Sequence, residues 1–511
     1  MFKLLYFKLD GHPQLGNLEL RFVEENEKNN AEKPYTTVII GANGTGKSFI
    51  LKTIADVFKQ FKDYQESEKK HFKLPFTIHL LYKLDSDHYE IVTRRLKPKG
   101  TKKEYRYFKN RPWEIPPAEI GPHAKEQSQF EVSLKNLGFP DNVIVASLIL
   151  NDRFTFSASR PQDFYQYLGV RRTRSVTSTS TFPRKTVRYL FESSQSKDFR
   201  SNLEEMLSFM SFEKYFQVRY KKRYRRIFFT EELTADTFDV FYTKWWTITE
   251  RKKTNPPYAA SRYKALKRNN PAKIESIVKF LKNESSQKSK ALEIDLFKDN
   301  TQTADLELLD ILVSLDILAL EVIQIRKKDQ QFSIEQSSSG EANLIISLLG
   351  LYSKIKPRSL ILFDEPEISL HPNWQMRYIY FLKQMYRKFP GCHFILASHS
   401  HFIVSDLEGA SSAVVSITRD RETNAITANL LEGKNTYGWS AEEVLFNVFN
   451  VKSTRNHYIE MAIADLLNLL AVKSEDFTAI SKIVSELKKL SLSDDDPLLV
   501  LIDEAEEYIR Q

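Results

Sequence analysis

The run Gly41-Ala42-Asn43-Gly44-Thr45-Gly46-Lys47-Ser48 fits the pattern G-x-x-x-x-G-K-[ST]. Its glycines allow the backbone to curl so that N–H groups face a chain of phosphates. We expect Lys47 to reach the β- and γ-phosphates and Ser48 to bind Mg²⁺. The predicted cofactors are therefore ATP and Mg²⁺. The predicted contacts with ATP are Gly41, Asn43, Gly44, Thr45, Gly46, Lys47 and Ser48.

The elements around this run have the pattern that such a loop requires. Residues 38–40 are β-branched and apolar, which favours a buried strand. Apolar residues then recur at helical spacing over 49–58. A strand, a loop and a helix in this order would point the positive end of the helix at the phosphates.

A second group of candidate residues follows the apolar run 360–363. Asp364 and Glu365 come directly after it, at the carboxyl end of a strand expected to be buried on both faces. Ligands of open α/β sheets bind at that end of the strands. Asp364 could hold Mg²⁺ together with Ser48, and Glu365 could polarise an attacking water.

Two further segments belong to the same group. The strand-like run 393–398 leads to His399, whose imidazole could hydrogen-bond a γ-phosphate. Residues 337–340, Ser-Ser-Ser-Gly, precede an apolar helix. Ser339 could cap that helix, and the free N–H groups at its start could bind an anion.

This order of motifs resembles the ABC-type ATPase head. More narrowly, "DEPEISLHPNWQ" (364–375) and "ASHSHFIVSD" (397–406) are similar to the SMC-like branch that includes RecF and the OLD proteins. "SSSGE" (337–341) departs from the transporter wording "LSGGQ", as that branch commonly does. The resemblance covers 1–60, 140–160 and 330–450 well and 61–139 loosely.

The resemblance implies an α/β fold and an ATP hydrolase whose two heads sandwich two ATP molecules. Lys47 would bind phosphate in its own subunit, and Ser339 and Gly340 would contact the γ-phosphate held by the other. Asp364 would hold Mg²⁺, Glu365 would be the general base and His399 the switch. Residues 369–371 take the position of the D-loop at the dimer interface. The family's Q-loop glutamine is missing, and Asp152 is the weak candidate for its place.

The resemblance also implies partners. The chain has neither the long coiled coil of SMC proteins nor, in its tail, room for the Toprim nuclease domain of OLD proteins. It is similar to bacterial anti-phage ATPases of the Septu (PtuA, also found beside retrons) and PARIS (AriA) types, which pair with a separate HNH or Toprim nuclease. We therefore expect a homo-oligomer of head-to-head dimers that controls such an effector. A RecF-like repair ATPase and an ATP-binding scaffold with little hydrolysis are the alternatives.

Composition and charge give a broader frame. The chain has 511 residues, a net charge of +9 and one cysteine, Cys392, which fits a reducing, cytoplasmic location. We expect no membrane partner, because the apolar stretches are too short to span a bilayer. Four parts are predicted: a first half of the head (1–160, with a basic loop at 94–111), a mostly helical basic insertion (161–304), a second half (305–436) and a helical C-terminal region (437–511).

The insertion contains "VRYKKRYRRIFF" at 218–229, where basic residues alternate with tyrosines. Such a segment could grip phosphates and stack on the bases of DNA or RNA. It could also dock an acidic protein, or be a solvated helix face whose tyrosines face the core. The candidate nucleic-acid contacts are Arg219, Lys221, Lys222, Arg223, Arg225 and Arg226.

Overall fold

The computed structural model describes most of the chain. The residues outside the description are 25–32, 68–73, 96–102, 113–127, 150–151, 158–161, 170, 172–181, 195–196, 252–257, 286–288, 299–302, 406, 421, 432–438, 448, 450, 452–454, 494–495 and 511. The chain forms two compact units, Met1–Gly438 and Trp439–Gln511.

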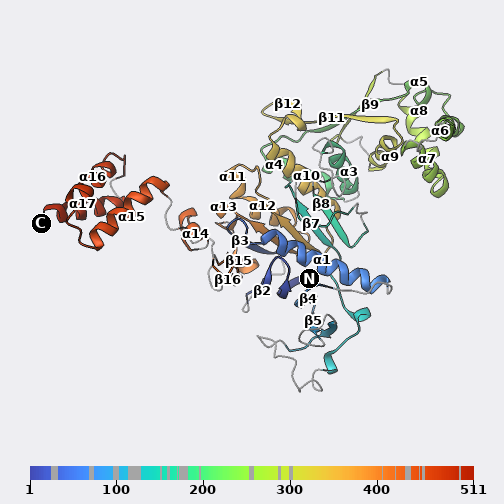
Figure 1. The fold of residues 1–511 in the computed structure, drawn as a ribbon. Helices are drawn as coiled ribbons and strands as arrows, with labels where there is room; N and C mark the ends of the chain where they lie inside the picture. The colour runs from blue at the N-terminus through green and yellow to red at the C-terminus, as the bar shows by residue number, and fades with distance from the viewer. Residues whose placement is uncertain are drawn as a thin grey trace. The chain divides into compact units, whose positions relative to one another are not determined.

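A seven-stranded sheet is the centre of the first unit (Figure 1). Six strands are parallel, and the edge strand β16 is antiparallel. In spatial order the strands are β16 (Ile426–Leu430), β15 (Ser412–Arg419), β3 (Tyr35–Gly41), β14 (His393–Ser398), β13 (Leu360–Asp364), β7 (Val143–Ser147) and β8 (Tyr165–Gly169). The central strands are buried throughout, as continuous apolar runs between two covering layers require. The predicted α/β fold is confirmed.

An antiparallel sheet of five strands shares a core with the first sheet. Its order is β2 (Gly16–Arg21), β1 (Phe2–His12), β4 (Thr77–Leu84), β5 (Asp87–Arg95) and β6 (Lys103–Lys109). Helix α1 (Lys47–Ser67) contributes Ile50, Ile54 and Phe58 to the core cluster that includes both sheets.

The prediction that 94–111 is a basic loop was wrong for its described ends. Arg94 and Arg95 end β5, and residues 103–109 form β6, which pairs antiparallel with it. Tyr105 and Tyr107 of β6 lie edge-on against Phe61 of α1, with ring centroids 5.7 and 6.1 Å away. The aromatic side chains pack on the core, and the intervening charged residues do not prevent pairing. Residues 96–102 lie outside the described part.

The insertion combines helices with a sheet of its own, and it extends to Ser333, beyond residue 304 where it was predicted to end. The sheet has the order β10 (Ala291–Asp295), β9 (Phe216–Lys222), β11 (Leu318–Lys327) and β12 (Gln330–Ser333), and all its pairs are antiparallel. The helices are α3 (Phe182–Ser194), α4 (Phe199–Phe209), α5 (Arg225–Phe228), α6 (Ala235–Arg251), α7 (Tyr258–Asn269), α8 (Ala272–Asn283) and α9 (Thr303–Ser314).

The helical interpretation of 218–222 is therefore wrong, because this segment is part of strand β9. Phe216, Val218 and Tyr220 are buried, whereas Gln217, Arg219 and Lys221 are not. An alternation with a period of two fits a strand with one face in the core. The main sheet also continues to Gly169, beyond residue 160, where the first half of the head was predicted to end.

The remaining helices of the first unit follow the signature and Asp364 segments. They are α10 (Ser339–Lys354), α11 (Pro372–Gln375), α12 (Tyr378–Met385) and α13 (His401–Ser405). Single 3₁₀ turns occur at Ser128–Phe130, Leu134–Asn136, Ile334–Gln336 and Gly409–Ser411. Phe381 of α12 stacks on Phe209 of α4 with 3.8 Å between ring centroids, which joins the second half of the head to the insertion.

The second unit contains α14 (Ala441–Asn447), α15 (His457–Ala471), α16 (Phe477–Leu487) and α17 (Pro497–Arg510). The last three helices enclose a small core of their own, with Leu466, Ile480 and Ile502 buried. Among the described residues of the whole chain, no helix combines the length and the apolar character needed to cross a membrane.

Candidate active site

Three neighbouring parallel strands bring the sequence motifs to one edge of the sheet. β3 leads into the loop 41–48, β14 ends before His399 and β13 ends at Asp364. β14 lies between the other two, and in this register Ile40 is opposite Ser398 while Ala397 is opposite Asp364. All three carboxyl ends therefore meet at one place, as the strand patterns predicted.

Lys47 is the first residue of α1, and its ammonium lies inside the loop. Nζ donates to the carbonyl oxygens of Gly41 at 2.8 Å and Ala42 at 3.2 Å. Burial lowers the pKa of Lys47 to about 8, and the nearby carboxylates of Glu365 and Asp364 limit the fall. A charged group so poorly hydrated is suited to bind an anion that can replace its carbonyl partners.

The loop is shaped by glycines that no larger residue could replace without a rearrangement. Gly46 has φ +97°, and a Cβ there would lie 2.7 Å from Leu15 Cδ2. The positive φ turns the chain just before α1, which leaves N–H groups at the start of the helix free to meet a ligand. A positive helix end of this kind favours phosphate.

Ser48 and Asp364 meet directly across the site. Ser48 Oγ donates to Asp364 Oδ1 at 2.8 Å. Burial raises the pKa of Asp364 to about 7, although the hydrogen bond from Ser48 opposes this. A buried carboxylate beside a hydroxyl is an oxygen donor set of the kind that Mg²⁺ uses with nucleotide phosphates. The two residues therefore fit the predicted metal.

Glu365 and His399 form the next contact. Their Oε1 and Nε2 atoms are 3.1 Å apart, and the hydrogen bond holds the pKa of Glu365 below its usual range. His399 Nδ1 lies 3.1 Å from Lys47 Nζ, which can only donate. The two contacts together assign the neutral imidazole with its proton on Nε2. His399 therefore connects the loop lysine to the candidate base.

The backbone at Glu365 is held in an unusual conformation. Its φ is +50°, in the left-handed region that non-glycine residues seldom adopt. The N–H of Glu365 donates to the carbonyl of Ala397 at 2.8 Å, which extends the β13–β14 ladder by one residue. A strained backbone conformation of this kind is kept only where surrounding contacts hold the residue in place, and it is common at functional sites.

Glu367 is a residue of the site that sequence reasoning missed. Its Oε1 accepts from Ser398 Oγ and from the backbone N–H of His399, both at 2.7 Å. Burial raises the pKa of Glu367. This carboxyl positions His399 by holding the end of β14. The only signal in the sequence was an acidic residue two positions after the Asp364–Glu365 pair.

A cavity of about 570 Å³ opens over these groups. This volume suits a small-molecule ligand. The cavity is lined by Gln14, Asn43, Gly44, Gly46, Lys47, Ser48, Phe49, Arg153, Glu365, His399 and Arg419. Gln14, Phe49, Arg153 and Arg419 were not among the predicted contacts. Arg153 lies over the ring of Phe49 at 5.1 Å, and Arg419 ends β15. Phe49 directly follows the loop, but nothing in the local sequence links Gln14, Arg153 or Arg419 to it, because they come from separate segments of the chain.

Two of the predicted ATP contacts in the loop are not among the described residues lining this cavity. Thr45 is buried, and its Oγ1 donates to the carbonyl of Ala42 at 2.9 Å, so the side chain shapes the loop. Gly41 ends β3, where a Cβ would lie 2.3 Å from the carbonyl oxygen of Ile417. Close packing against β15 explains why glycine is needed at position 41.

The signature segment is also absent from the described lining of the cavity. Ser338 caps α10, since its side chain accepts from Glu341 N at 3.2 Å and its N–H donates to the Glu341 carboxylate at 2.9 Å. The prediction that Ser339 caps this helix was therefore wrong, because Ser338 is the capping residue. The side chain of Ser339 is outside the described part. A Cβ at Gly340 would lie 2.0 Å from the carbonyl oxygen of Ser369, so the signature and D-loop segments are in contact within one chain.

Asp152, the weak candidate for the Q-loop, is occupied by its own chain. Arg171 Nη2 donates to Asp152 Oδ1 at 2.6 Å, and Tyr167 Oη donates to Oδ2 at 2.5 Å. The carboxylate is fully buried. Its neighbour Arg153, and not Asp152, reaches the cavity.

Three of the six predicted nucleic-acid contacts are engaged in ion pairs. Arg219 lies 3.4 Å from Glu293 and 3.1 Å from Glu321, and Lys222, which is buried, lies 3.1 Å from Glu284. Arg223 pairs with Asp316. Arg225 and Arg226 lie on the short helix α5, and Lys221 is exposed on β9. Three of the six residues are therefore already paired with carboxylates, which weakens their case as phosphate contacts.

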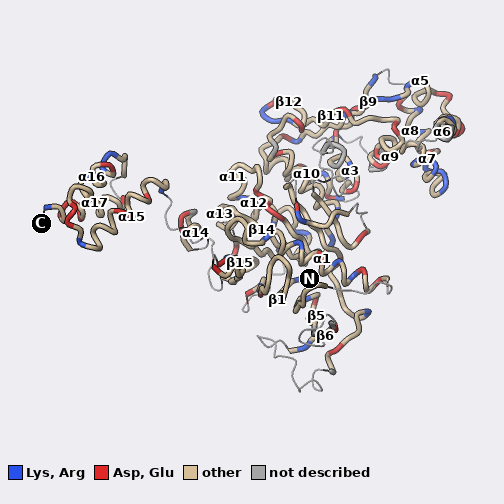
Figure 2. The backbone as a smooth tube through the Cα atoms, viewed as in Figure 1, with Lys and Arg blue, Asp and Glu red and all other residues tan. Residues whose placement is uncertain are grey.

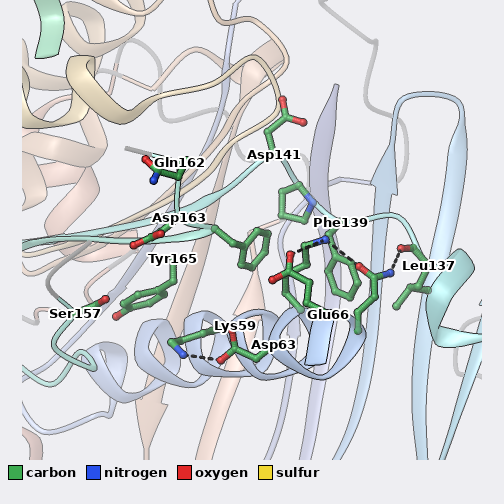
Figure 3. A pocket seen from close by; sticks show the side chains of 14 residues that line it. Lys59, Asp63, Glu66, Leu137, Phe139, Asp141, Ser157, Gln162, Asp163 and Tyr165 are labelled. Carbon is green, nitrogen blue, oxygen red and sulfur yellow. Dashed lines mark hydrogen bonds and ion pairs between the residues drawn. The ribbon is translucent and has the colours of Figure 1, made fainter. Parts of the chain in front are cut away.

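A second cavity of about 610 Å³ lies along the far half of α1 (Figure 3). Figure 3 shows Lys59 joined to Asp63, and Lys62 similarly pairs with Glu66 at 3.4 Å. Phe139 and Tyr165 form apolar parts of its wall. Its lysines are paired with carboxylates, and among the described residues that line it there is no glycine-rich loop leading into a helix, so this cavity differs from the first.

Comparison with known proteins gives two kinds of match. A family model, AAA_21, described as "AAA domain, putative AbiEii toxin, Type IV TA system", matches residues 36–405. The Septu protein PtuA of Bacillus thuringiensis is 26% identical over 168 residues, which cover 30% of this chain and 41% of PtuA. The match thus spans less than half the length of that relative.

Solved structures of SMC head domains are also similar. The Smc head domain of Pyrococcus furiosus, bound to the C-terminal domain of ScpA, is 14% identical, with 84% of this chain and 96% of that chain covered and a TM-score of 0.33. The SMC head domain of Thermotoga maritima is 14% identical, with 84% and 99% covered and the same TM-score of 0.33.

Proposed function

The chain belongs to the AAA_21 family, and we propose that its 41–48 cavity binds and hydrolyses ATP to switch a dimer of heads between two states. One observation supports this most. Lys47 contacts His399, which in turn contacts Glu365, and Ser48 contacts Asp364, so the ends of three neighbouring strands bring these five side chains together at one site. Each of these side chains has the chemistry that phosphate binding or hydrolysis needs.

The roles follow from these contacts. Lys47 exchanges its carbonyl partners for phosphate oxygens, and the N–H groups of the loop add further donors. Ser48 and Asp364 would hold Mg²⁺, which supplies charge neutralisation on the phosphates when it is bound. Asp364 must be ionised for that role, so its raised pKa makes metal binding dependent on pH.

Glu365 is proposed to act as the general base. Its low pKa keeps it ionised at neutral pH, so that it can accept a proton from water. The water oxygen then forms a bond to the γ-phosphorus, and the bond from that phosphorus to the β–γ bridging oxygen breaks. The electron pair leaves with ADP. His399 donates to Glu365 and so orients it.

The signature segment is proposed to act on a second subunit. Ser339 and Gly340 would meet the phosphates held by the loop of the partner, so that neither half-site is complete alone. Hydrolysis would then remove the contact that holds the heads together. Losing several charge-assisted hydrogen bonds, at about 1.5–3 kcal/mol each, would change the dimer equilibrium by orders of magnitude.

The likeness to PtuA suggests what the switch controls. We propose a role in bacterial anti-phage defence, in which the dimer, within a larger homo-oligomer, holds or releases a separate nuclease of the HNH or Toprim type. The dimer is expected to act in the cytoplasm. The chain's charge of +9 and the basic insertion support an additional contact with nucleic acid.

Two experiments test this function at different levels. Sedimentation velocity of the Glu365→Gln variant with and without ATP should show a shift to the dimer or a larger assembly with ATP, and no shift in a Lys47→Ala variant. Phage plating on cells that carry the gene with its neighbouring genes should show protection that the Lys47→Ala variant loses. Nucleotide-independent assembly would contradict the switch, and undiminished protection by Lys47→Ala would contradict its use in defence.

A further inference from the structure

Helix α7 of the insertion presents an exposed cationic and aromatic surface that none of the predicted contacts includes. Its sequence, YAASRYKALKRN, contains four basic residues and no acidic one. Arg262, Lys264 and Arg268 are exposed, and Tyr258 is 70% exposed. In Figure 2 the tube of α7 carries blue bands at the end of the insertion.

Helical spacing places these side chains on one face. Tyr258, Arg262, Ala265 and Arg268 follow one another at steps of three or four residues, which stack on the same side of a helix. Lys264 lies at the margin of that face. The opposite face carries Ala259, Ala260 and Tyr263, which are buried.

The opposite face is anchored firmly, so the cationic face is held outward. Tyr263 stacks on Tyr242 of α6 with 4.6 Å between centroids, and its hydroxyl donates to Asp239 at 2.8 Å. Lys267 Nζ donates to both oxygens of Asp239 at 2.7 Å. The carboxylate of Asp239 on α6 is thus neutralised by Lys267 of α7.

The aromatic residues on this surface already lie beside cations. Lys264 Nζ lies 4.3 Å from the centre of the Trp246 ring, and the guanidinium of Arg262 lies 5.9 Å from that of Tyr258. A cation beside an exposed ring can bind a phosphate while the ring stacks on the adjoining base. Arg219 on β9 differs in that two carboxylates, those of Glu293 and Glu321, lie within 3.4 Å of it. Burial raises the pKa of the Asp310 carboxyl on α9, although Arg262 is close enough to act against this.

We propose that the exposed face of α7, with Trp246 of α6, binds single-stranded nucleic acid. The surface is a ridge of one helix, with a freely accessible tyrosine and three cations spaced along it. Backbone phosphates would contact Arg262, Lys264 and Arg268, and a splayed base would stack on Tyr258. A duplex hides its bases from such a ridge, so an unpaired strand is the ligand that uses both features.

The test measures binding of fluorescent dT30 and rU30 oligonucleotides to the full chain by anisotropy, over a range of salt concentrations. The triple variant Arg262→Ala, Lys264→Ala, Arg268→Ala should bind at least about tenfold more weakly, and its log–log salt slope should fall by about 2, because each phosphate contact on a single strand contributes about 0.7. Tyr258→Ala should weaken binding at least about fivefold and leave the salt slope unchanged.

A matched control removes the same charge elsewhere in the insertion: Arg219→Ala, Lys221→Ala, Arg223→Ala. This variant should bind within about twofold of the parent, because two of its three side chains are already paired with carboxylates. The charge-preserving variant Arg262→Lys, Arg268→Lys should keep the parental salt slope, which separates lost contacts from lost folding. A preference for dT30 or rU30 identifies the natural strand.

Three results would overturn the proposal. One is that the parent binds neither oligonucleotide at low salt. Another is that the control variant loses as much affinity as the α7 variant. The third is that polyglutamate or duplex DNA of the same length competes as well as the single strand, since the surface would then be a dock for acidic proteins or a general polyanion contact. ATP turnover is not part of this test, so its outcome is independent of the proposed switch.

Discussion

Replacing Glu365 with glutamine removes one charge from the cavity and leaves its shape intact. The glutamine oxygen can still accept the hydrogen bond that His399 now gives over 3.1 Å, so the side chain should keep its place. An amide cannot take a proton from water. Loss of a general base costs about 10²–10⁴-fold in rate, or ~2.7–5.4 kcal/mol in the barrier at 1.36 kcal/mol per tenfold.

ATP binding should survive the same change. Lys47 keeps its hydrogen bonds to the loop carbonyls and its contact with His399, and Ser48 and the loop N–H groups are unchanged. Loss of the Glu365 carboxylate removes one group that raises the pKa of Lys47, but bound phosphates raise it in the same way. Removing the negative charge of Glu365 also reduces repulsion of phosphate. The expected dissociation constant for ATP is therefore equal to or lower than that of the parent.

The assay compares steady-state phosphate release with ATP affinity measured by equilibrium dialysis. Glu422→Gln is the matched control, because this glutamate is exposed and lies outside the cavity, so its variant should turn over at the parental rate. The reasoning is refuted if Glu365→Gln hydrolyses ATP as fast as the parent. Loss of ATP binding in this variant would show that Glu365 supports the nucleotide and is not its base.

The remaining predictions concern protonation, the metal and the second unit. The carboxylate of Asp364, with a pKa of about 7, forms only as pH rises through 7. The ammonium of Lys47, with a pKa of about 8, is lost as pH rises through 8. Mg-ATP affinity, measured by dialysis, should therefore be highest between these two pH values and fall about tenfold per pH unit on either side. Asp364→Asn should abolish Mg²⁺-dependent turnover, yet raise the melting temperature of the nucleotide-free protein at pH 8. A carboxyl whose pKa is higher in the folded than in the unfolded protein destabilises the fold as pH rises above the unfolded pKa, near 3.9. An unchanged or lower melting temperature would count against this. Leu466→Ala in the fully buried core of α15–α17 should cost that unit about 2–5 kcal/mol, seen as faster hydrogen exchange within 439–511 while ATP affinity stays at the parental value.

The motifs of the cavity could be predicted because their signals are local. Each apolar run that ends at Asp364 or at the serine before His399 predicts a buried strand whose carboxyl end is known from the sequence. Parallel pairing of such strands then places these ends at the same edge of the sheet. The residues that the sequence did not reveal reach the cavity from elsewhere. Gln14 comes from the β1–β2 turn and Arg419 from the end of β15, and neither is part of a motif.

The insertion was harder to predict for the same physical reason. The sequence predicted that Arg219 is available to bind phosphate, because its partners Glu293 and Glu321 belong to strands about 70 to 100 residues further along the chain. Strand β9 lies between β10 and β11, and only that pairing explains why its tyrosine is buried and its arginine neutralised. On α7, by contrast, the absence of any acidic residue is visible within twelve residues.

The claim that two chains complete one site can be tested most directly by mixing inactive subunits. Lys47→Ala disables the loop of one chain and Ser339→Arg the signature of the other, so each variant alone should show almost no turnover. If the site is shared, the mixture should recover about a quarter of the parental ATPase rate, since about half of the dimers would pair the two variants and each would keep one intact site. A mixture as inactive as its components would contradict the account.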